Sequence, residues 1–319
     1  MTLHQAVLSA HSIIQPHILR TPLEYSPWLS QKWRANVWLK MEQIQITGSF
    51  KLRGAAHKMM KLSEGEKVKG IIAASTGNHG AAVAYIGQKL GLSCEIYLPQ
   101  NVAPAKVGLM ELYGAHLHYV GDDAIQAELT ARAQAQQQGK VFVSPYNDWD
   151  IVAGQGTMGK EIVEDLPEVD AIFVPVGGGG LISGVAAYTQ AIDRPIEIIG
   201  CQPAHSAVMY ESIMAGKILD IPSLPTLSDG TAGGMELDSI TFSLCQEGVD
   251  RWVLVSEEEI QQALYFLLEK HYLMVEGAAG LALAAFEKSA QDYAGKTIVL
   301  TLCGRKMGLQ ILTDLLAQG

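Results

Sequence analysis

Residues 171–192 read AIFVPVGGGGLISGVAAYTQAI, and this stretch decides the fold class. The run from Ala171 to Val176 has the composition of a buried strand, and a helical segment through Ile192 follows the four glycines. A tight strand-to-helix turn needs only one or two glycines, so four in a row provide extra backbone freedom. Successive glycine N–H groups at a helix start can converge on an anion. We therefore predict a strand–turn–helix unit that binds phosphate.

The same unit recurs on both sides of this stretch. Further strands are predicted at Gly70–Ser75, Cys94–Leu98, His116–Val120, Val141–Val143, Ile196–Cys201 and Thr297–Leu302. Helices are predicted at Ala81–Leu90, from about Pro104, and at Asp122–Gln138, Gly156–Asp165, Val208–Ala215, Glu257–Lys270 and Gly280–Lys288. This alternation predicts an α/β protein of two lobes, each an open, mostly parallel twisted sheet flanked by helices.

Composition narrows the class of protein. With 319 residues, 48% hydrophobic and 18% charged, the chain is long enough for two globular domains. A net charge of −10 and a pI near 5.4 argue against a nucleic-acid-binding protein. The four cysteines form no CxxC pair, and no apolar run is long enough to span a membrane or to act as a signal peptide. We expect a cytoplasmic protein with reduced thiols.

A lysine supplies the first chemical signal. The segment TGSFKLRG, residues 47–54, places Lys51 after small and polar residues and an aromatic, near a predicted helix start. A lysine with a lowered pKa can attack an aldehyde to form a Schiff base and can later move a proton. Taken alone, the segment is more typical of a solvated surface lysine.

A polar turn supplies the second signal. The segment STGNHG, residues 75–80, follows a predicted strand, where open α/β sheets bind ligands. Its hydroxyl and backbone donors suit a carboxylate, and Asn78 can hydrogen-bond a phenolate-type oxygen. Helix capping by Ser75, Thr76 or Asn78 is the structural alternative.

A cysteine at another strand end completes the set. Cys303 lies in the segment TLCG, residues 301–304, where its thiol can face a ring nitrogen or simply fill the core. A lysine, a phosphate site, a turn with carboxylate and amide chemistry, and a polar strand end are what an aldehyde-and-phosphate cofactor needs. Pyridoxal 5′-phosphate (PLP) fits this combination.

These residues resemble the serine/threonine dehydratase and serine racemase group of fold-type II PLP enzymes. The resemblance runs from about Thr21 to Gly304 and rests on four motifs in order: SFKLRG at residues 49–54, STGNHG at 75–80, AGQGT at 153–157 and GGGGL at 177–181. It implies a larger PLP-binding domain formed by residues 1–52 and 146–319. Residues 53–145 would form a smaller domain that closes over the substrate.

The resemblance also implies a role for each site residue. Lys51 would carry PLP and remove the α-proton, with the ring beside Phe50, its phenolate oxygen on Asn78 and its nitrogen at Cys303, where the family usually has serine. The phosphate would bind Gly177, Gly178, Gly179, Gly180 and Leu181. Ser75, Thr76 and His79 would hold the substrate carboxylate. The implied reaction is loss of water from serine, threonine or a 3-hydroxyaspartate, giving a 2-oxo acid and ammonia.

Alternatives remain open within and outside this reaction. Thr76 occupies the position of a racemase serine, so racemisation is an alternative with Thr76 as a second catalytic residue, although residues 121–128 contain no arginine of the racemase kind. The same chemistry also serves β-replacement, as in cysteine synthases. A protein that binds PLP without turnover is the alternative outside catalysis. The resemblance favours a homodimer.

Four further features of the sequence bear on the comparison with the family. Gln202 and Val208 stand where the family has cation ligands, so we expect no metal. Arg305 and Lys306 follow the cysteine where the family has glycine and asparagine; they are either solvated or favour an acidic substrate. Glu276 lies either near the cofactor ring or at a helix cap. The chain ends about one helix after Cys303, so no regulatory domain is expected.

Overall fold

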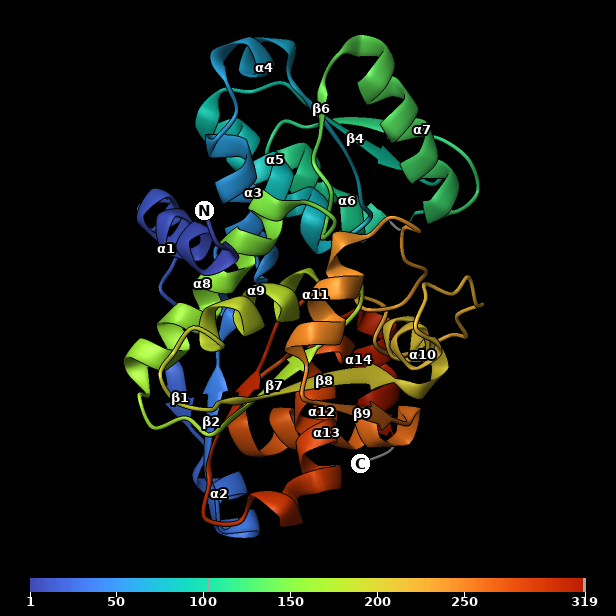
Figure 1. Ribbon diagram of the computed structural model, residues 1–319. Coiled ribbons are helices and arrows are strands. Elements are labelled where there is room, and N and C mark those ends of the chain that lie inside the picture. Colours follow the sequence, from blue (N-terminus) through green and yellow to red (C-terminus); the bar gives the residue numbers. More distant parts are fainter. Residues whose placement is uncertain (103, 318–319) are drawn as a thin grey trace.

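The computed structural model describes residues 1–102 and 104–317. Figure 1 shows two sheets, each covered by helices, with the N-terminal helix beside the region where the two parts meet. One sheet has six strands and the other has four. The sequence-based prediction of two α/β lobes with mostly parallel sheets is confirmed.

The larger sheet has the strand order β1-β2-β10-β7-β8-β9. Its strands are β1 (Leu23–Tyr25), β2 (Asn36–Lys40), β7 (Ala171–Pro175), β8 (Glu197–Pro203), β9 (Arg251–Val255) and β10 (Thr297–Thr301). All pairs are parallel except β1 with β2. Helix α13 (Gly277–Ser289) packs on one face, and α9 (Gly180–Thr189) packs on the other.

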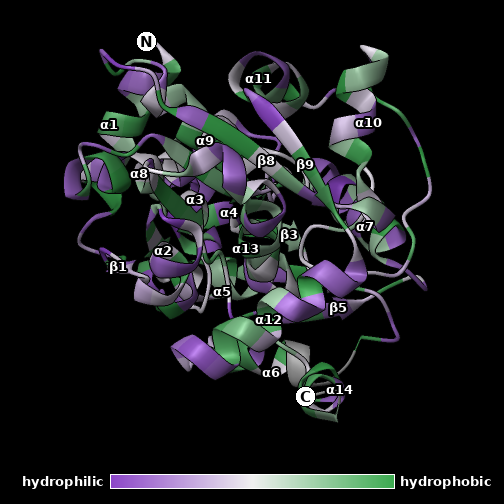
Figure 2. Cartoon of the chain, turned by 90° about the horizontal axis from the view of Figure 1, so that it is seen from below, coloured by the Kyte–Doolittle hydropathy of each residue, from purple (hydrophilic) through white to green (hydrophobic). Residues whose placement is uncertain are grey.

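The helices on the outside of the larger sheet are amphipathic. Helix α12 (Glu257–His271) packs on α13, and α11 (Ile240–Gly248) packs on α9. Figure 2 shows hydrophilic and hydrophobic colours on α12, whose buried residues Ile260, Ala263, Leu264 and Leu267 recur at helical spacing. The remaining elements here are α2 (Pro27–Trp33), η1 (Glu42–Ile44), η2 (Ala204–Ser206), α10 (Val208–Ala215), η3 (Ala290–Tyr293) and α14 (Leu309–Ala317).

The smaller sheet has the order β5-β4-β3-β6, and all its pairs are parallel. Its strands are β3 (Ile71–Ala74), β4 (Cys94–Leu98), β5 (His116–Tyr119) and β6 (Val141–Phe142). Its helices are α3 (Lys51–Met60), α4 (Glu64–Lys69), α5 (Asn78–Leu90), α6 (Pro104–Leu112) and α7 (Ala124–Gln138). Helix α7 packs on one face of the sheet and α5 packs on the other.

Two helices connect the parts. Helix α8 (Trp149–Asp165) packs against α3 and α9, and α1 (Leu3–Ile14) packs against α8. The predicted start of α8 at Gly156 is seven residues too late. The helix begins at Trp149, because the Asp148 carboxylate accepts from the N–H groups of Asp150 and Ile151, at 2.8 and 3.2 Å.

A buried ion cluster ties α3 to this framework. The Arg53 guanidinium lies 2.7 Å from carboxylate oxygens of both Glu42 and Glu161, and Lys40 Nζ lies 2.7 Å from Glu161. All four side chains are at most 1% exposed. Because each buried charge has an opposite partner, the cluster holds the first turn of α3 on β2 and α8. No helix in the described part of the chain is long and apolar enough to cross a membrane.

Candidate active site

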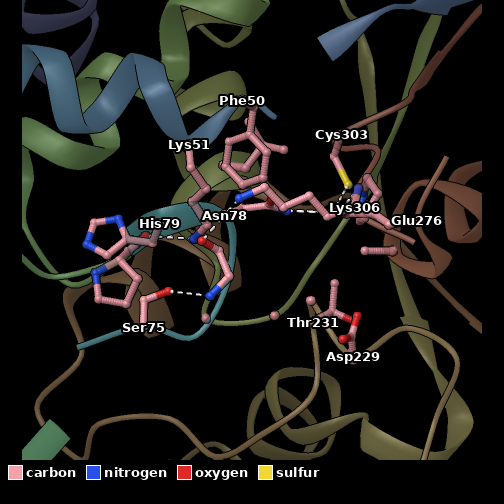
Figure 3. A pocket seen from close by; sticks show the side chains of 18 of the residues that line it. Phe50, Lys51, Ser75, Asn78, His79, Asp229, Thr231, Glu276, Cys303 and Lys306 are labelled. Atoms are coloured by element: carbon pink, nitrogen blue, oxygen red, sulfur yellow. Dashed lines mark hydrogen bonds between the residues drawn. The ribbon is translucent and has the colours of Figure 1, made fainter. Parts of the chain in front are cut away.

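A cavity of about 420 Å³ opens at the carboxyl ends of the strands, the edge where α/β sheets bind ligands. Residues following β3, β7 and β10 line it, together with the first turn of α3. Figure 3 shows their side chains converging from these separate elements. Every predicted site residue lines this cavity, namely Phe50, Lys51, Ser75, Thr76, Asn78, His79, Gly177, Gly178, Gly179, Gly180, Leu181 and Cys303.

Lys51 begins helix α3, directly after Phe50. Its Nζ donates to the carbonyl oxygen of Pro145 at 2.9 Å and lies 5.1 Å from the centre of the Phe50 ring. Burial lowers the pKa of this amine to about 8. A much larger share of Lys51 is therefore unprotonated near neutral pH than of an ordinary lysine, which makes it a competent nucleophile and base.

The glycine run lies at the start of α9 with its backbone N–H groups unpaired among the described residues. In the described part of the chain, none of the N–H groups of residues 177–181 donates to another residue. Gly179 has φ +82°, and Thr241 Oγ1 donates to the Gly178 carbonyl at 2.6 Å. A Cβ at Gly178 would lie 2.5 Å from the Tyr146 ring. These contacts fix the loop with its N–H groups free, as a phosphate requires.

The polar turn leads directly into α5. Ser75 Oγ accepts from the Gly77 N–H at 3.2 Å, and the helix begins at Asn78. His79 Nε2 donates to the Val143 carbonyl at 2.8 Å, and burial lowers the pKa of this imidazole to about 3. The ring is therefore neutral with Nδ1 unprotonated, so the side chain has no second N–H for a carboxylate. The hydroxyls and the backbone N–H groups of the turn are the donors left for an anionic ligand.

Glu276 connects the turn to the strand end carrying Cys303. Its carboxylate accepts from Asn78 Nδ2 at 2.9 and 2.8 Å and from the Lys306 N–H at 3.2 Å. Its side chain makes no capping bond to α13, so of its two expected positions it takes the one in the cavity. Burial raises the pKa of Glu276, because a charged carboxylate is poorly solvated here.

Cys303 stays a neutral thiol in this environment. Burial, together with the nearby Glu276, raises its pKa well above the ordinary value, and its Sγ lies 3.9 Å from Glu276 Oε1. A thiol can donate to or accept weakly from a ring nitrogen but adds no fixed charge.

Arg305 and Lys306 are separated by the structure. Lys306 lines the cavity, with Nζ 3.4 Å from the Gly77 carbonyl oxygen. Arg305 is exposed, and its side chain covers Gly48 outside the cavity. Of the two cations that sequence reasoning considered together, only Lys306 faces the site.

The side chain of Gln202 forms hydrogen bonds to the backbone of neighbouring segments. Its Nε2 donates to the Val176 carbonyl at 3.2 Å, and its Oε1 accepts from the Tyr210 N–H at 2.8 Å. Among the described residues, no group of three or more histidine, cysteine, aspartate or glutamate side chains is arranged to hold a metal ion.

Sequence reasoning missed several residues that line the cavity. Tyr146 packs under the glycine run, while Asp229 and Thr231 come from the long loop between α10 and α11. None belongs to a recognisable motif, so no sequence signal pointed to them. Tyr146 directly follows Pro145, which accepts from Lys51, and this adjacency becomes informative only in the folded chain.

The residues fit PLP when tested on this geometry. A lysine with a lowered pKa, a set of unpaired N–H groups and the buried Asn78 Oδ1, which has no hydrogen-bond partner among the described residues, surround one cavity. The amine suits an aldehyde, the N–H groups suit a phosphate, and the amide oxygen can accept from a ring O–H or N–H. The fold and the site together fit one class of protein, the α/β enzymes that use a phosphate-bearing aldehyde cofactor.

Comparison with known proteins agrees with this class. The family described as "Pyridoxal-phosphate dependent enzyme" matches residues 14–304. An L-threonine ammonia-lyase of Thermotoga maritima is 37% identical over 316 residues, covering 98% of this chain and 78% of the relative. The chain belongs to the family of pyridoxal-phosphate dependent enzymes.

Two solved structures place the fold within that family. The processed form of threonine deaminase isoform 2 from Solanum lycopersicum has a TM-score of 0.93 at 31% identity, over 98% of this chain and 92% of the other. Maize serine racemase has a TM-score of 0.90 at 30% identity, over 98% of both chains. The fold is fold-type II.

Proposed function

We propose that this protein is a PLP-dependent ammonia-lyase that removes water from a small β-hydroxy amino acid, giving a 2-oxo acid and ammonia. The position of Lys51 carries the proposal. Its amine has a pKa lowered to about 8, and it lines a cavity together with the glycine run and the polar turn of residues 75–80. The names of the relatives support the lyase reaction with threonine as the first substrate to test. The similarity to a serine racemase adds serine.

Bound at this site, PLP would supply an aldehyde for the substrate amine and a ring that stabilises negative charge at the α-carbon. Lys51, Phe50, Asn78, Gly177–Leu181 and Cys303 would hold it. The free N–H groups of the glycine run offer the phosphate several donors and the positive end of the α9 dipole. The neutral Cys303 thiol would leave the ring nitrogen without a charged partner, which moderates this stabilisation.

The protein's own residues would perform the proton transfers and the orientation of substrate. Lys51 Nζ would take the α-proton, because an amine with a pKa of about 8 is well matched to neutral pH. Ser75 and Thr76, with N–H groups of the turn, would bind the substrate carboxylate. His79 would position the turn through its bond to Val143.

The proposal also covers the two domains, the oligomeric state and the location of the protein. Residues 53–145 would act as the smaller domain that closes over the substrate, and residues 1–52 and 146–319 as the PLP-binding domain. Helix α7 already contacts the loop of the larger part, since Arg132 lies 2.6 Å from Glu236. We further propose a homodimer that works in the cytoplasm.

Racemisation is the second candidate, and Thr76 favours it. Its hydroxyl lines the same cavity as Lys51, so it is available as a second acid or base for the α-carbon. The similarity to maize serine racemase supports the same alternative. A racemase would invert serine without releasing ammonia.

The test is a spectrum followed by product analysis. Purified protein should absorb near the Schiff-base band, and this band should be absent in Lys51→Ala. Lys58→Ala is the matched control, because Lys58 lies on the same helix but pairs with Asp148 at 2.7 Å. Addition of L-serine, L-threonine or threo-3-hydroxyaspartate should then give 2-oxo acid and ammonia. Inverted serine without ammonia would support the racemase, and the absence of any band would contradict both candidates.

A further inference from the structure

Lys306 is a second cation in the cavity, and neither anchoring of PLP nor removal of the α-proton needs it. It follows β10 at the same strand end as Cys303, and Figure 3 shows its side chain reaching across the site towards Asn78. Its Nζ lies 3.4 Å from the carbonyl oxygen of Gly77, which belongs to the polar turn of residues 75–80. The long side chain thus extends from the larger sheet to the turn of the smaller one.

Among the residues that the structure describes, the ammonium of Lys306 forms no ion pair. Within the described residues, no aspartate or glutamate oxygen lies within 4.0 Å of Nζ, and the single contact to Gly77 is long for a hydrogen bond. The Glu276 carboxylate, which also lines the cavity, accepts from the Lys306 backbone N–H instead. Two of the three ammonium hydrogens are therefore available to a ligand.

The charge state of this group suits an anion. Burial is the main cause that lowers the pKa of Lys306 to about 8, so the amine is still mostly protonated at pH 7. The Glu276 carboxyl and the Arg305 guanidinium shift that pKa in opposite directions. A half-buried cation without an ion partner gains more from an anionic ligand than an exposed one does, because less water screens the interaction.

We infer that Lys306 binds a second carboxylate on the substrate, so that the enzyme prefers β-hydroxy amino acids with an acidic β-substituent, of the 3-hydroxyaspartate type. The inference rests on the proposed ammonia-lyase function and adds its substrate class. The α-carboxylate would occupy the donors of the 75–80 turn, while the β-carboxylate would meet Lys306 beside Gly77. For 3-hydroxyaspartate, loss of water and hydrolysis would give a four-carbon 2-oxo diacid and ammonia.

The kinetic test compares PLP-loaded wild type, Lys306→Met and Arg305→Met. The measured quantity is the ratio of kcat/KM for threo-3-hydroxyaspartate to that for L-threonine. Since a hydrogen bond to a charged group contributes about 1.5–3 kcal/mol, the ratio should fall roughly 10- to 150-fold in Lys306→Met. Arg305→Met should leave it within about twofold, because Arg305 is exposed outside the cavity. Lys306→Arg should restore part of the ratio.

A binding test examines the role of Lys306 independently of the ammonia-lyase reaction. Succinate and butyrate have the same four-carbon chain, but only succinate has a second carboxylate. Titration calorimetry on PLP-loaded protein should show tighter binding of succinate in wild type and loss of that preference in Lys306→Met. The Schiff-base band of each variant reports whether its site is intact.

The outcomes distinguish the two claims. If wild type forms no 2-oxo acid from any substrate but prefers succinate through Lys306, the ammonia-lyase proposal fails while the anion site stands. Equal losses for threonine and 3-hydroxyaspartate in Lys306→Met would mean that Lys306 serves the α-carboxylate, which overturns the inference. An unchanged ratio would overturn it as well, as would equal affinity of wild type for succinate and butyrate.

Discussion

Asn78 Nδ2 lies 2.9 Å from Oε1 and 2.8 Å from Oε2 of Glu276, so one amide group spans both oxygens of a buried carboxyl. Asn78 begins α5 in the smaller part and Glu276 precedes α13 in the larger part. The contact therefore joins the two parts inside the cavity. It also leaves Asn78 Oδ1 buried without a partner among the described residues.

Replacement of Glu276 tests how the raised pKa of this residue affects the stability of the fold at different pH values. Burial raises the folded-state pKa of Glu276 above its ordinary value of 4.5, so the folded protein binds this proton more tightly than the unfolded chain. This contribution is fully present below pH 4.5 and is lost as pH rises through the folded pKa. Cofactor-free Glu276→Gln, which lacks the titration, should become progressively more stable relative to wild type as pH rises above 4.5.

Urea unfolding of wild type and Glu276→Gln at several pH values measures this difference. A difference in the free energy of unfolding that stays constant from pH 4 to pH 8 would show that Glu276 is not perturbed in the folded state. The amide of the variant can still accept from Asn78, so the comparison keeps the contact itself.

His79 should have the opposite pH dependence. Its folded-state pKa is about 3 against an ordinary 6.5, so the unfolded chain binds the proton more tightly. Stability from this group is complete above pH 6.5 and is lost as pH falls towards 3, by at most roughly 5 kcal/mol at about 1.4 kcal/mol per pKa unit. His79→Gln, which keeps a donor for Val143, should therefore gain stability relative to wild type on acidification.

Acid unfolding followed by circular dichroism measures this effect. His116→Gln is the control, because His116 is exposed and its replacement should leave the acid transition close to that of wild type. Identical acid transitions for His79→Gln and wild type would contradict the expectation.

The glycine cradle predicts a steric defect. A Cβ at residue 178 would meet the Tyr146 ring at 2.5 Å, so Gly178→Ala must displace either the ring or the loop. Such crowding costs about 1–3 kcal/mol, and we expect PLP affinity to fall by the corresponding roughly 5- to 150-fold. Gly234→Ala should bind PLP as wild type does, because no atom lies within 4 Å of its added Cβ. Fluorescence titration with PLP provides the affinities, and equal values for the two variants would argue against the steric account.

The buried ion cluster predicts a large loss of stability. Arg53→Met leaves Glu42 and Glu161 without their shared guanidinium partner in a site at most 1% exposed. Breaking a buried pair in this way costs about 3–5 kcal/mol. Arg20→Met removes contacts to the Glu164 and Asp165 carboxylates at the surface and should cost less than about 1 kcal/mol. Similar unfolding midpoints for the two variants in urea would show that the buried cluster is not a stabilising feature.

The sequence predicted correctly the bounds of those helices and strands that a short local pattern marks. The strand Cys94–Leu98 and the helix Val208–Ala215 have the predicted bounds, since an apolar run and a terminal glycine mark them. The start of α8 was wrong because its first two turns contain Trp149 and Asp150, whose pattern is not clearly helical. The antiparallel β1 was not predicted either, because three residues are too few for a pattern.

The sequence by itself determined the α/β class and singled out the glycine run and Lys51 as site candidates, because glycine runs and strand-to-helix turns restrict the backbone over a few residues. Only the tertiary structure decided that β10 pairs with both β2 and β7, and that Lys306 faces the cavity while its neighbour Arg305 does not. Parallel strands pair across long stretches of chain, and the direction of a side chain after a strand end depends on what packs against it. The composition of the chain and the spacing of its motifs determine neither the strand pairing nor the direction of these side chains.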